Sequence, residues 1–347
     1  MAPRTKKVAH KRSRQDRDTT PAPDVEFTDT THQHRFERLS NLKFGQSRYI
    51  CWETLDAIGL TDEVRGLVQV GGWERLLSIH DAVRRDITLE VLTTFSYSRE
   101  RPDASFDTEN VVRFRAFGVF HGMSLTQFAM TLGLYDQDFI DSPDYQELWT
   151  DFPPDVTPGQ IYHDLCGDSH YVAGQSKGSS LTRHAHRYIH AILSRSITGR
   201  GDGTGALSRT DLLYLYSMTQ GVPLHLGHVV ADFFRHQSQY LRTGALFVGP
   251  YVTRLMFQMR LMLSVRGKER VSTPTPLGLV TLRLMGVVRR TASGGYALVE
   301  SSSDDTESVG APDAPSPPGP SVTPAAPISD SISTTFGLKF KKLLALV

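Results

Sequence analysis

The chain has 347 residues, 39% hydrophobic and 22% charged, which excludes a wholly disordered protein and suffices for one large domain or two small ones. Lysine and arginine total 38 against 37 aspartate and glutamate, so a net charge of +1 gives no global attraction to nucleic acid or membranes. Two cysteines, Cys51 and Cys166, cannot build a cysteine-rich zinc module, and neither a signal-peptide pattern nor a run of 18 apolar residues occurs. We therefore expect a soluble intracellular protein with no membrane partner.

The first seventeen residues are strongly basic, with seven cations against the single acid Asp16. Such a segment cannot bury enough apolar surface to fold, and we interpret residues 1–32 as a disordered basic tail. Clustered, extended cations are what a nuclear-import receptor reads, and the candidate residues are Lys6, Lys7, Lys11, Arg12 and Arg14. The alternative is a solubilising tail that attracts polyanions such as DNA or RNA.

Helical patterns dominate residues 33–299, which we predict to form a mainly α, helical globular domain. Thr61 before two acids predicts a helix N-cap, and apolar residues at helical spacing follow near Trp73 and through residues 88–95. These segments are expected to lie in the core.

The middle of the domain contains the one clear strand pattern. Residues 112–116 alternate apolar with basic, and a second apolar run after Gly118 predicts a small β-hairpin. Ser124 and Gln127 then have the spacing of a capping box, and the helix that they begin should end at Gly133.

The second half shows four helical stripes. One runs from Ser180 to the glycine-rich segment 199–205, Ser208 caps the next, residues 226–241 form the third, and Pro250 begins the fourth. After the last element, 277–288, a turn and a short apolar run indicate a terminal hairpin.

Two patterns have both a functional and a simpler interpretation. His186 and His190 stand four residues apart, as a metal pair would on a helix, but neighbouring arginines would repel a cation, which favours a polar helix flank. The glycine-rich segment lacks the preceding strand and following Lys-Ser or Lys-Thr of a phosphate-binding loop, so we interpret it as a connector. Neither pattern predicts a cofactor.

Arg113 and Arg115 are the candidate nucleic-acid contacts within the domain. They lie on one face of the predicted strand, with Phe114 and Phe117 nearby, and could form a basic surface with aromatic neighbours. A solvated strand face is the alternative.

No catalytic signature is recognisable. The chain has no Gly-x-Ser-x-Gly elbow, and its cysteines lack a nucleophile motif, so we predict no enzyme, no cofactor, no metal and no small-molecule substrate. A metal-dependent nuclease or integrase-like activity would need scattered carboxylates, for which the candidates are Asp56, Asp86, Asp211 and Asp232.

Residues 300–347 differ sharply from the domain. Glu300 to Asp330 has no lysine or arginine, and seven prolines lie between Pro312 and Pro327, which predicts an extended, self-repelling, disordered tail. The chain closes with a short basic and apolar segment, residues 336–347, that could form a docking helix or return to the core.

The order of the core segments resembles the plant transposon protein domain, also described as the first-open-reading-frame protein of Athila-type plant LTR retrotransposons. The similarity covers about residues 36–299, and the segments that carry it are 48–50, 55–60, 72–77, 88–95, 112–115, 124–134, 186–200 and 247–255. A looser similarity, of residues 112–134, is to the plant mobile domain associated with aminotransferase-like proteins.

The resemblance implies retroelement ancestry and no established catalytic residues. We therefore expect a retrotransposon-derived structural protein that acts by self-association, by weak nucleic-acid binding or by both, with a basic tail for nuclear entry. The alternatives are the metal-dependent enzyme and a nuclear protein-interaction module.

Overall fold

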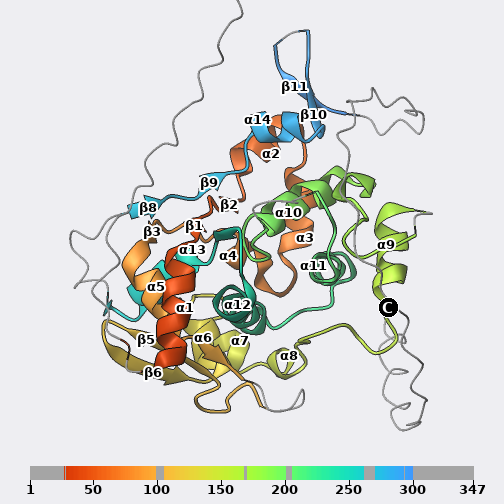
Figure 1. The fold of residues 1–347 in the computed structure, drawn as a ribbon. Coiled ribbons are helices and arrows are strands. Elements are labelled where there is room, and N and C mark those ends of the chain that lie inside the picture. The colour runs from red at the N-terminus through yellow and green to blue at the C-terminus, as the bar shows by residue number, and fades with distance from the viewer. Residues whose placement is uncertain are drawn as a thin grey trace, which may run out of the picture. The chain divides into compact units, whose positions relative to one another are not determined.

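Short α-helices are the predominant regular elements of the described residues, so the predicted mainly α fold with a small hairpin is confirmed (Figure 1). The computed structural model describes residues 27, 29–98, 105–167, 170–200, 205–261, 270–292 and 294–299, which all belong to one unit. The predicted tails, residues 1–32 and 300–347, lie outside the described residues except for 27 and 29–32. The first helix begins at Thr30, slightly before the predicted start of the domain.

The helices are α1 (Thr30–Ser40), α2 (Trp52–Ile58), α3 (Thr61–Val68), α4 (Trp73–Leu77), α5 (Arg85–Thr94), α6 (Leu125–Thr131), α7 (Gln137–Ile140), α8 (Pro143–Gln146), α9 (Pro158–Cys166), α10 (His184–Ser194), α11 (Arg209–Gln220), α12 (Leu226–Arg235), α13 (Gly249–Gln258) and α14 (Leu279–Leu284). Two 3₁₀ turns, η1 (Val70–Gly72) and η2 (Gly178–Ser180), and a π turn, η3 (His236–Tyr240), complete the helical elements of the described part. None of these helices is long and apolar enough to cross a membrane.

The strands are β1 (Lys43–Phe44), β2 (Arg48–Tyr49), β3 (Val83–Arg84), β4 (Ser96–Tyr97), β5 (Val112–Ala116), β6 (Val119–Met123), β7 (Ala245–Leu246), β8 (Arg270–Ser272), β9 (Thr275–Pro276), β10 (Val288–Arg290) and β11 (Tyr296–Leu298). β4, β5 and β6 form an antiparallel sheet in that order. Four two-stranded pairs join the other strands: β1 with β7 and β2 with β9 in parallel, and β3 with β8 and β10 with β11 antiparallel. The parallel pairs connect segments that are far apart in the sequence.

Two helices are buried on nearly all sides. Eight of the ten residues of α5 and nine of the eleven of α10 are buried. α5 packs against α1, α13 and β5, whereas α10 packs against α3 and α11, which lie beside it in Figure 1. The apolar core is therefore built around these two helices.

Most of the predicted local signals are confirmed. Ser124 and Gln127 form a capping box at α6, and Gly133 ends that helix with a left-handed φ of 76°. Ser208 caps α11, and β10 and β11 form the terminal hairpin. Thr61 is an exception: it is the first residue of α3 rather than its N-cap, which is Leu60, and its hydroxyl donates to the carboxylate of Asp56.

The prediction that His186 and His190 form a polar helix flank is wrong, since both side chains are buried. Thr219 donates its hydroxyl to the Leu215 carbonyl, so it accepts from Nε2 of His186 at 3.2 Å. This leaves Nδ1 of His186 unprotonated, buried and without a hydrogen-bond partner. Burial, together with nearby Arg183, lowers the pKa of His186 to about 4.

We predict that His186 makes stability depend on pH below neutrality. Its pKa lies below the unfolded value of 6.5, so the unfolded chain takes up a proton that the folded chain refuses. Stability is therefore lost as the pH falls from 6.5 towards 4. Between pH 7 and 5, the urea-derived free energy of unfolding should fall by about 2 kcal/mol more in the wild type than in His186→Leu. The matched control, His34→Leu on the exposed side of α1, should keep the wild-type slope; equal slopes for all three proteins would contradict this account.

Candidate polyanion-binding groove

An open groove of about 830 Å³ lies where the ends of α1 and α10 meet the β1–β7 pair. It is lined by Arg38, Asn41, Leu42, Lys43, Gly45, Gln46, Arg195, Arg242, Thr243, Gly244, Ala245 and Phe247, which we call the basic groove. The parallel pairing of β1 with β7 brings its two walls together. Gly45 permits the close approach, because a Cβ atom there would lie 2.4 Å from the ring of Phe247.

The basic groove contains four cations and no acid. Lys43 and Arg242 are exposed, and Arg38 and Arg195 are half-buried. None of the four forms an ion pair within the described part of the chain. The C-terminal ends of α1 and α10 contribute roughly half a negative charge each, which is far less than four positive charges. The groove therefore presents a net positive field to solvent.

The arginines beside the groove also affect one another. Burial first, and then the nearby positive charges of Arg242 and Arg35, lower the pKa of Arg38. The pKa of Arg48 is lowered by burial and then by Arg195, whose carbonyl accepts the Arg48 N–H at 3.3 Å. Crowded like charges favour a bound anion, since the anion relieves their repulsion.

A smaller cavity of about 220 Å³ continues the positive surface on the other side of Arg195. We call it the Lys177 pocket, and it is lined by Lys177, Gly178, Ser179, Arg187, His190, Ala191, Ser194, Arg195, Gly205, Met285 and Val287. Its lining also contains no Asp or Glu. Arg195, which ends α10, lines both cavities and so joins them.

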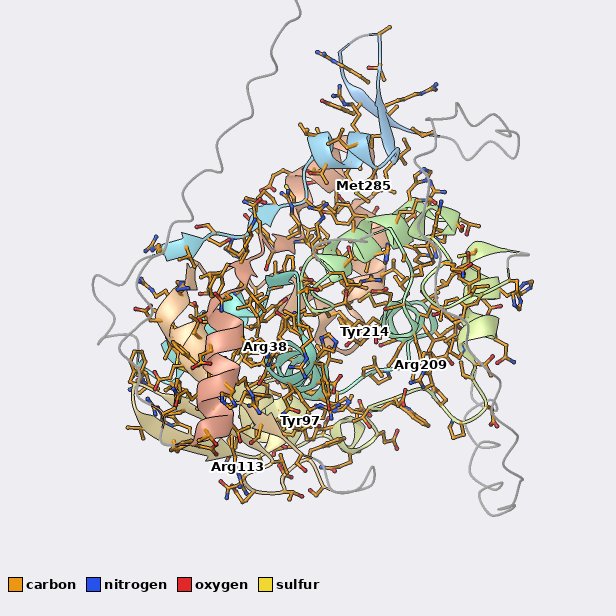
Figure 2. All side chains as sticks on the ribbon, viewed as in Figure 1. Arg38, Tyr97, Arg113, Arg209, Tyr214 and Met285 are labelled. Carbon is orange, nitrogen blue, oxygen red and sulfur yellow. The ribbon has the colours of Figure 1, made fainter. Side chains whose placement is uncertain are left out.

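The two arginines predicted as nucleic-acid contacts have different surroundings. Arg115 donates from Nε to Oε1 of Glu90 at 2.8 Å, and its guanidinium lies over the ring of Phe27, with only 16% of the side chain exposed. Arg113 is exposed and bonds through Nε to the Asn110 carbonyl. Figure 2 shows Arg113 at the hairpin, apart from Arg38 beside α1.

Two aromatic residues of this hairpin also differ from each other in exposure. Phe114 is fully buried on the opposite face of β5, whereas Phe120, directly across from Arg115 in β6, is 65% exposed. The sequence pattern assigned Phe120 to the apolar run of the hairpin and did not indicate its exposure, because Val119 and Phe120 are both exposed and β6 lacks the alternation of a half-buried strand. The hairpin therefore offers one exposed cation and one exposed aromatic ring, a much weaker anion site than the groove.

The four aspartates that were candidates for a metal-dependent activity have other contacts or positions in the structure. Asp56 accepts from Thr61, Asp211 completes the capping box of α11, and Asp232 pairs with Arg235. Asp86 lies in the first turn of α5. No group of three or more His, Cys, Asp or Glu side chains that could hold a metal occurs in the described ranges.

Asp211 and His190 form a buried ionic cluster behind the Lys177 pocket. Arg200 pairs with Oδ2 of Asp211 at 2.5 Å, and Nε2 of His190 lies 3.8 Å from the same oxygen. Burial, opposed by Asp211, lowers the pKa of His190. Arg200 also contacts Nε2 of His190 at 3.4 Å.

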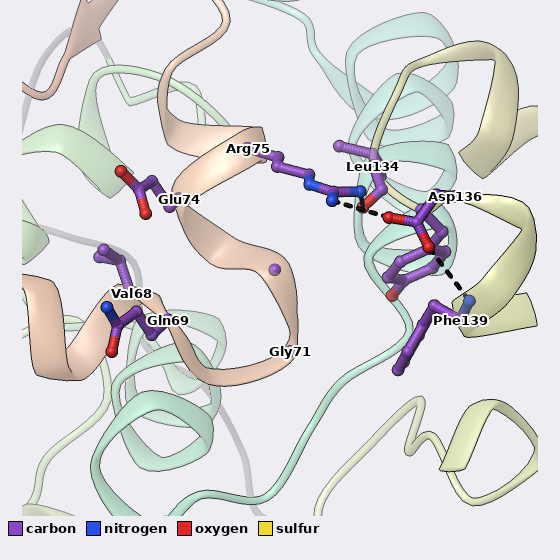
Figure 3. A pocket seen from close by; sticks show the side chains of 10 residues that line it. Val68, Gln69, Gly71, Glu74, Arg75, Leu134, Asp136 and Phe139 are labelled. Atoms are coloured by element: carbon purple, nitrogen blue, oxygen red, sulfur yellow. Dashed lines mark hydrogen bonds and ion pairs between the residues drawn. The ribbon is translucent and has the colours of Figure 1, made fainter. Parts of the chain in front are cut away.

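A third cavity, shown in Figure 3, differs in its electrostatics. In this pocket of about 370 Å³, Arg75 donates to Asp136 at 2.8 Å, and Asp136 also accepts from the backbone N–H of Phe139. Glu74 also lines this pocket, so its lining has two acids against one arginine and lacks the excess positive charge of the groove.

The import-like residues, Lys6, Lys7, Lys11, Arg12 and Arg14, lie outside the described residues. The groove cations were missed by sequence reasoning because they come from three separate segments, 38–46, 195 and 242–247, each with only one or two groove cations. No family model matches the chain, and no curated protein or solved structure is significantly similar to it.

We predict that Arg115, through its ion pair with Glu90, stabilises the fold. Glu90 accepts from the N–H groups of Phe117 and Gly118 as well as from Arg115, so it holds the β5–β6 turn. Glu90→Ala should lower the free energy of unfolding by about 3 kcal/mol, because it strands a largely buried cation and two backbone donors. Arg113→Gln, on the same face of β5, serves as the control and should leave the urea midpoint unchanged. Equal effects of the two substitutions would show that Glu90 does not hold the hairpin.

Proposed function

We propose that this protein is a non-enzymatic structural protein that binds nucleic acid through the phosphate backbone, with the basic groove as its principal contact. The observation that carries the proposal is the basic groove, whose lining contains four cations and no acid. Lysine and arginine that neutralise phosphates release condensed counterions, which gives binding that weakens steeply with salt.

The lining of the groove favours backbone contact without reading of base sequence. Its charged residues are all lysine or arginine, and backbone contacts by such residues position a protein without specifying bases. DNA and RNA share this phosphate chemistry, so the proposal covers both. The basic tail, residues 1–17, adds cations to the same interaction.

Retroelement ancestry is part of the proposal and rests on the resemblance to the plant transposon protein domain. The roles of Asp56, Asp211 and Asp232 in hydrogen bonds and ion pairs support a non-enzymatic protein. Nuclear entry through the basic tail also belongs to the proposal. We expect a fluorescent full-length fusion to be excluded from the nucleus when five tail cations are changed to Gln, namely Lys6, Lys7, Lys11, Arg12 and Arg14.

Self-association is favoured by the edge of the hairpin sheet. β6 pairs only with β5 among the described strands, and its residues Val119 and Phe120 are 59% and 65% exposed. An exposed edge with apolar side chains is a ready template for pairing with another chain. We expect sedimentation to show dimers or larger assemblies of the full chain that Phe120→Lys dissociates.

The groove prediction is tested by removing two of its cations. In the full chain, Lys43→Gln combined with Arg242→Gln should weaken binding of a labelled DNA duplex at low salt. The slope of log K against log salt should become shallower by about 1.8, since each lost phosphate contact contributes roughly 0.9.

The matched control changes the same net charge elsewhere. Arg65→Gln combined with Arg209→Gln removes two exposed arginines that line neither the groove nor the Lys177 pocket. This variant should keep the wild-type slope. A further variant with Gln at the five tail cations separates tail from groove. If that variant alone abolishes binding while the groove variant binds as the wild type does, the groove has no role.

A further inference from the structure

The Lys177 pocket has the composition of a site for one highly charged anion with a small organic group. Three cations, Lys177, Arg187 and Arg195, line it, and none of them has an ion-pair partner among the described residues. Arg187 uses Nε to bond the Leu181 carbonyl, which fixes its guanidinium in place. Lys177 is exposed.

The back of the pocket is rigid and polar. The ring of His190 packs so closely on Gly178 that a Cβ atom there would lie 2.4 Å from Nδ1. His190 is 4% exposed and is held from behind by Asp211 and Arg200. His190 therefore contributes a fixed polar ring to the lining of the pocket. The negative charge of Asp211 is offset by Arg200 and does not repel a ligand strongly.

The remaining wall and the size restrict the ligand. Ala191, Met285 and Val287 form an apolar side, and Figure 2 shows Met285 next to α14. The volume of about 220 Å³ lies below the roughly 300 Å³ at which pockets for drug-sized ligands begin. The pocket thus suits a phosphate group with a small attached group better than a whole dinucleotide.

We propose that the Lys177 pocket binds a terminal phosphate monoester of a nucleic-acid strand whose following backbone phosphates lie along the basic groove. A monoester carries up to two negative charges near neutral pH, whereas each internal diester carries one, so a pocket lined by three cations favours the terminus. Arg195, shared by the two cavities, contacts both parts of the strand. This inference rests on the proposed function and adds recognition of strand ends to it.

The test compares labelled single-stranded DNA of one sequence with a 5′-phosphate, a 3′-phosphate or hydroxyls at both ends, bound to the full chain at fixed salt. One of the two phosphorylated oligonucleotides should bind roughly tenfold more tightly than the oligonucleotide with hydroxyls at both ends. A gain of this size is typical of charge-assisted hydrogen bonds. Lys177→Gln should abolish this preference and leave affinity for the hydroxyl form nearly unchanged. Adenosine 5′-monophosphate should compete with the phosphorylated end only.

The matched control is Lys43→Gln, which removes an equally exposed lysine on the other side of Arg195. It should weaken all three oligonucleotides by the same factor and so preserve the preference. If the wild type binds all three equally, or if Lys177→Gln weakens all three equally, end recognition is wrong while the proposed backbone binding stands. If none of the three oligonucleotides binds to the wild type, both end recognition and the proposed backbone binding are wrong.

Discussion

The fold depends on arginines that satisfy the carbonyl groups at the ends of its short helices. Every α-helix leaves its last carbonyls without partners within the helix, and a fold of many short helices has many such ends. α1 and α5 do this for each other: Arg35 of α1 donates to the carbonyls of Thr93 and Phe95, and Arg85 of α5 donates to that of Ser40 at 2.9 Å. Arg38 donates in the same way to carbonyls at the end of η3. These bonds fix the antiparallel packing of α1 on α5.

This use of arginine has an electrostatic consequence. A carbonyl satisfies a guanidinium hydrogen bond without neutralising its charge, whereas Asp81 and Asp211 neutralise Arg254 and Arg200. Positive charge therefore persists along α1 and accumulates beside the end of α10, although the chain as a whole is nearly neutral. The basic groove and the Lys177 pocket lie where these unneutralised cations meet, and an anion bound there completes the charge balance that the fold leaves open.

Local sequence signals predicted local structure well. The strand 112–116, the capping box at Ser124, the N-cap Ser208 and the terminal hairpin are set by residues within a few positions of one another, so their patterns are visible in the chain. The roles of charged residues were not visible. Arg115 looked like a surface cation because its partner, Glu90, lies on another helix, and His186 looked polar because its burial depends on packing against α11. The basic groove was not predicted because it also depends on contacts between distant segments. The parallel pairing of β1 with β7 creates it.

Lysine footprinting tests the central claim most directly, because Lys43 and Lys177 are the two lysines in the described part of the chain and lie on either side of Arg195. The full chain would be acetylated briefly with and without a saturating oligonucleotide that carries a phosphate at both ends, and each lysine would be quantified by mass spectrometry. We expect the nucleic acid to protect Lys43 and Lys177 together, whether or not the tail lysines Lys6, Lys7 and Lys11 are protected. Protection confined to the tail lysines, with Lys43 and Lys177 modified at the same rate in both samples, would contradict the account.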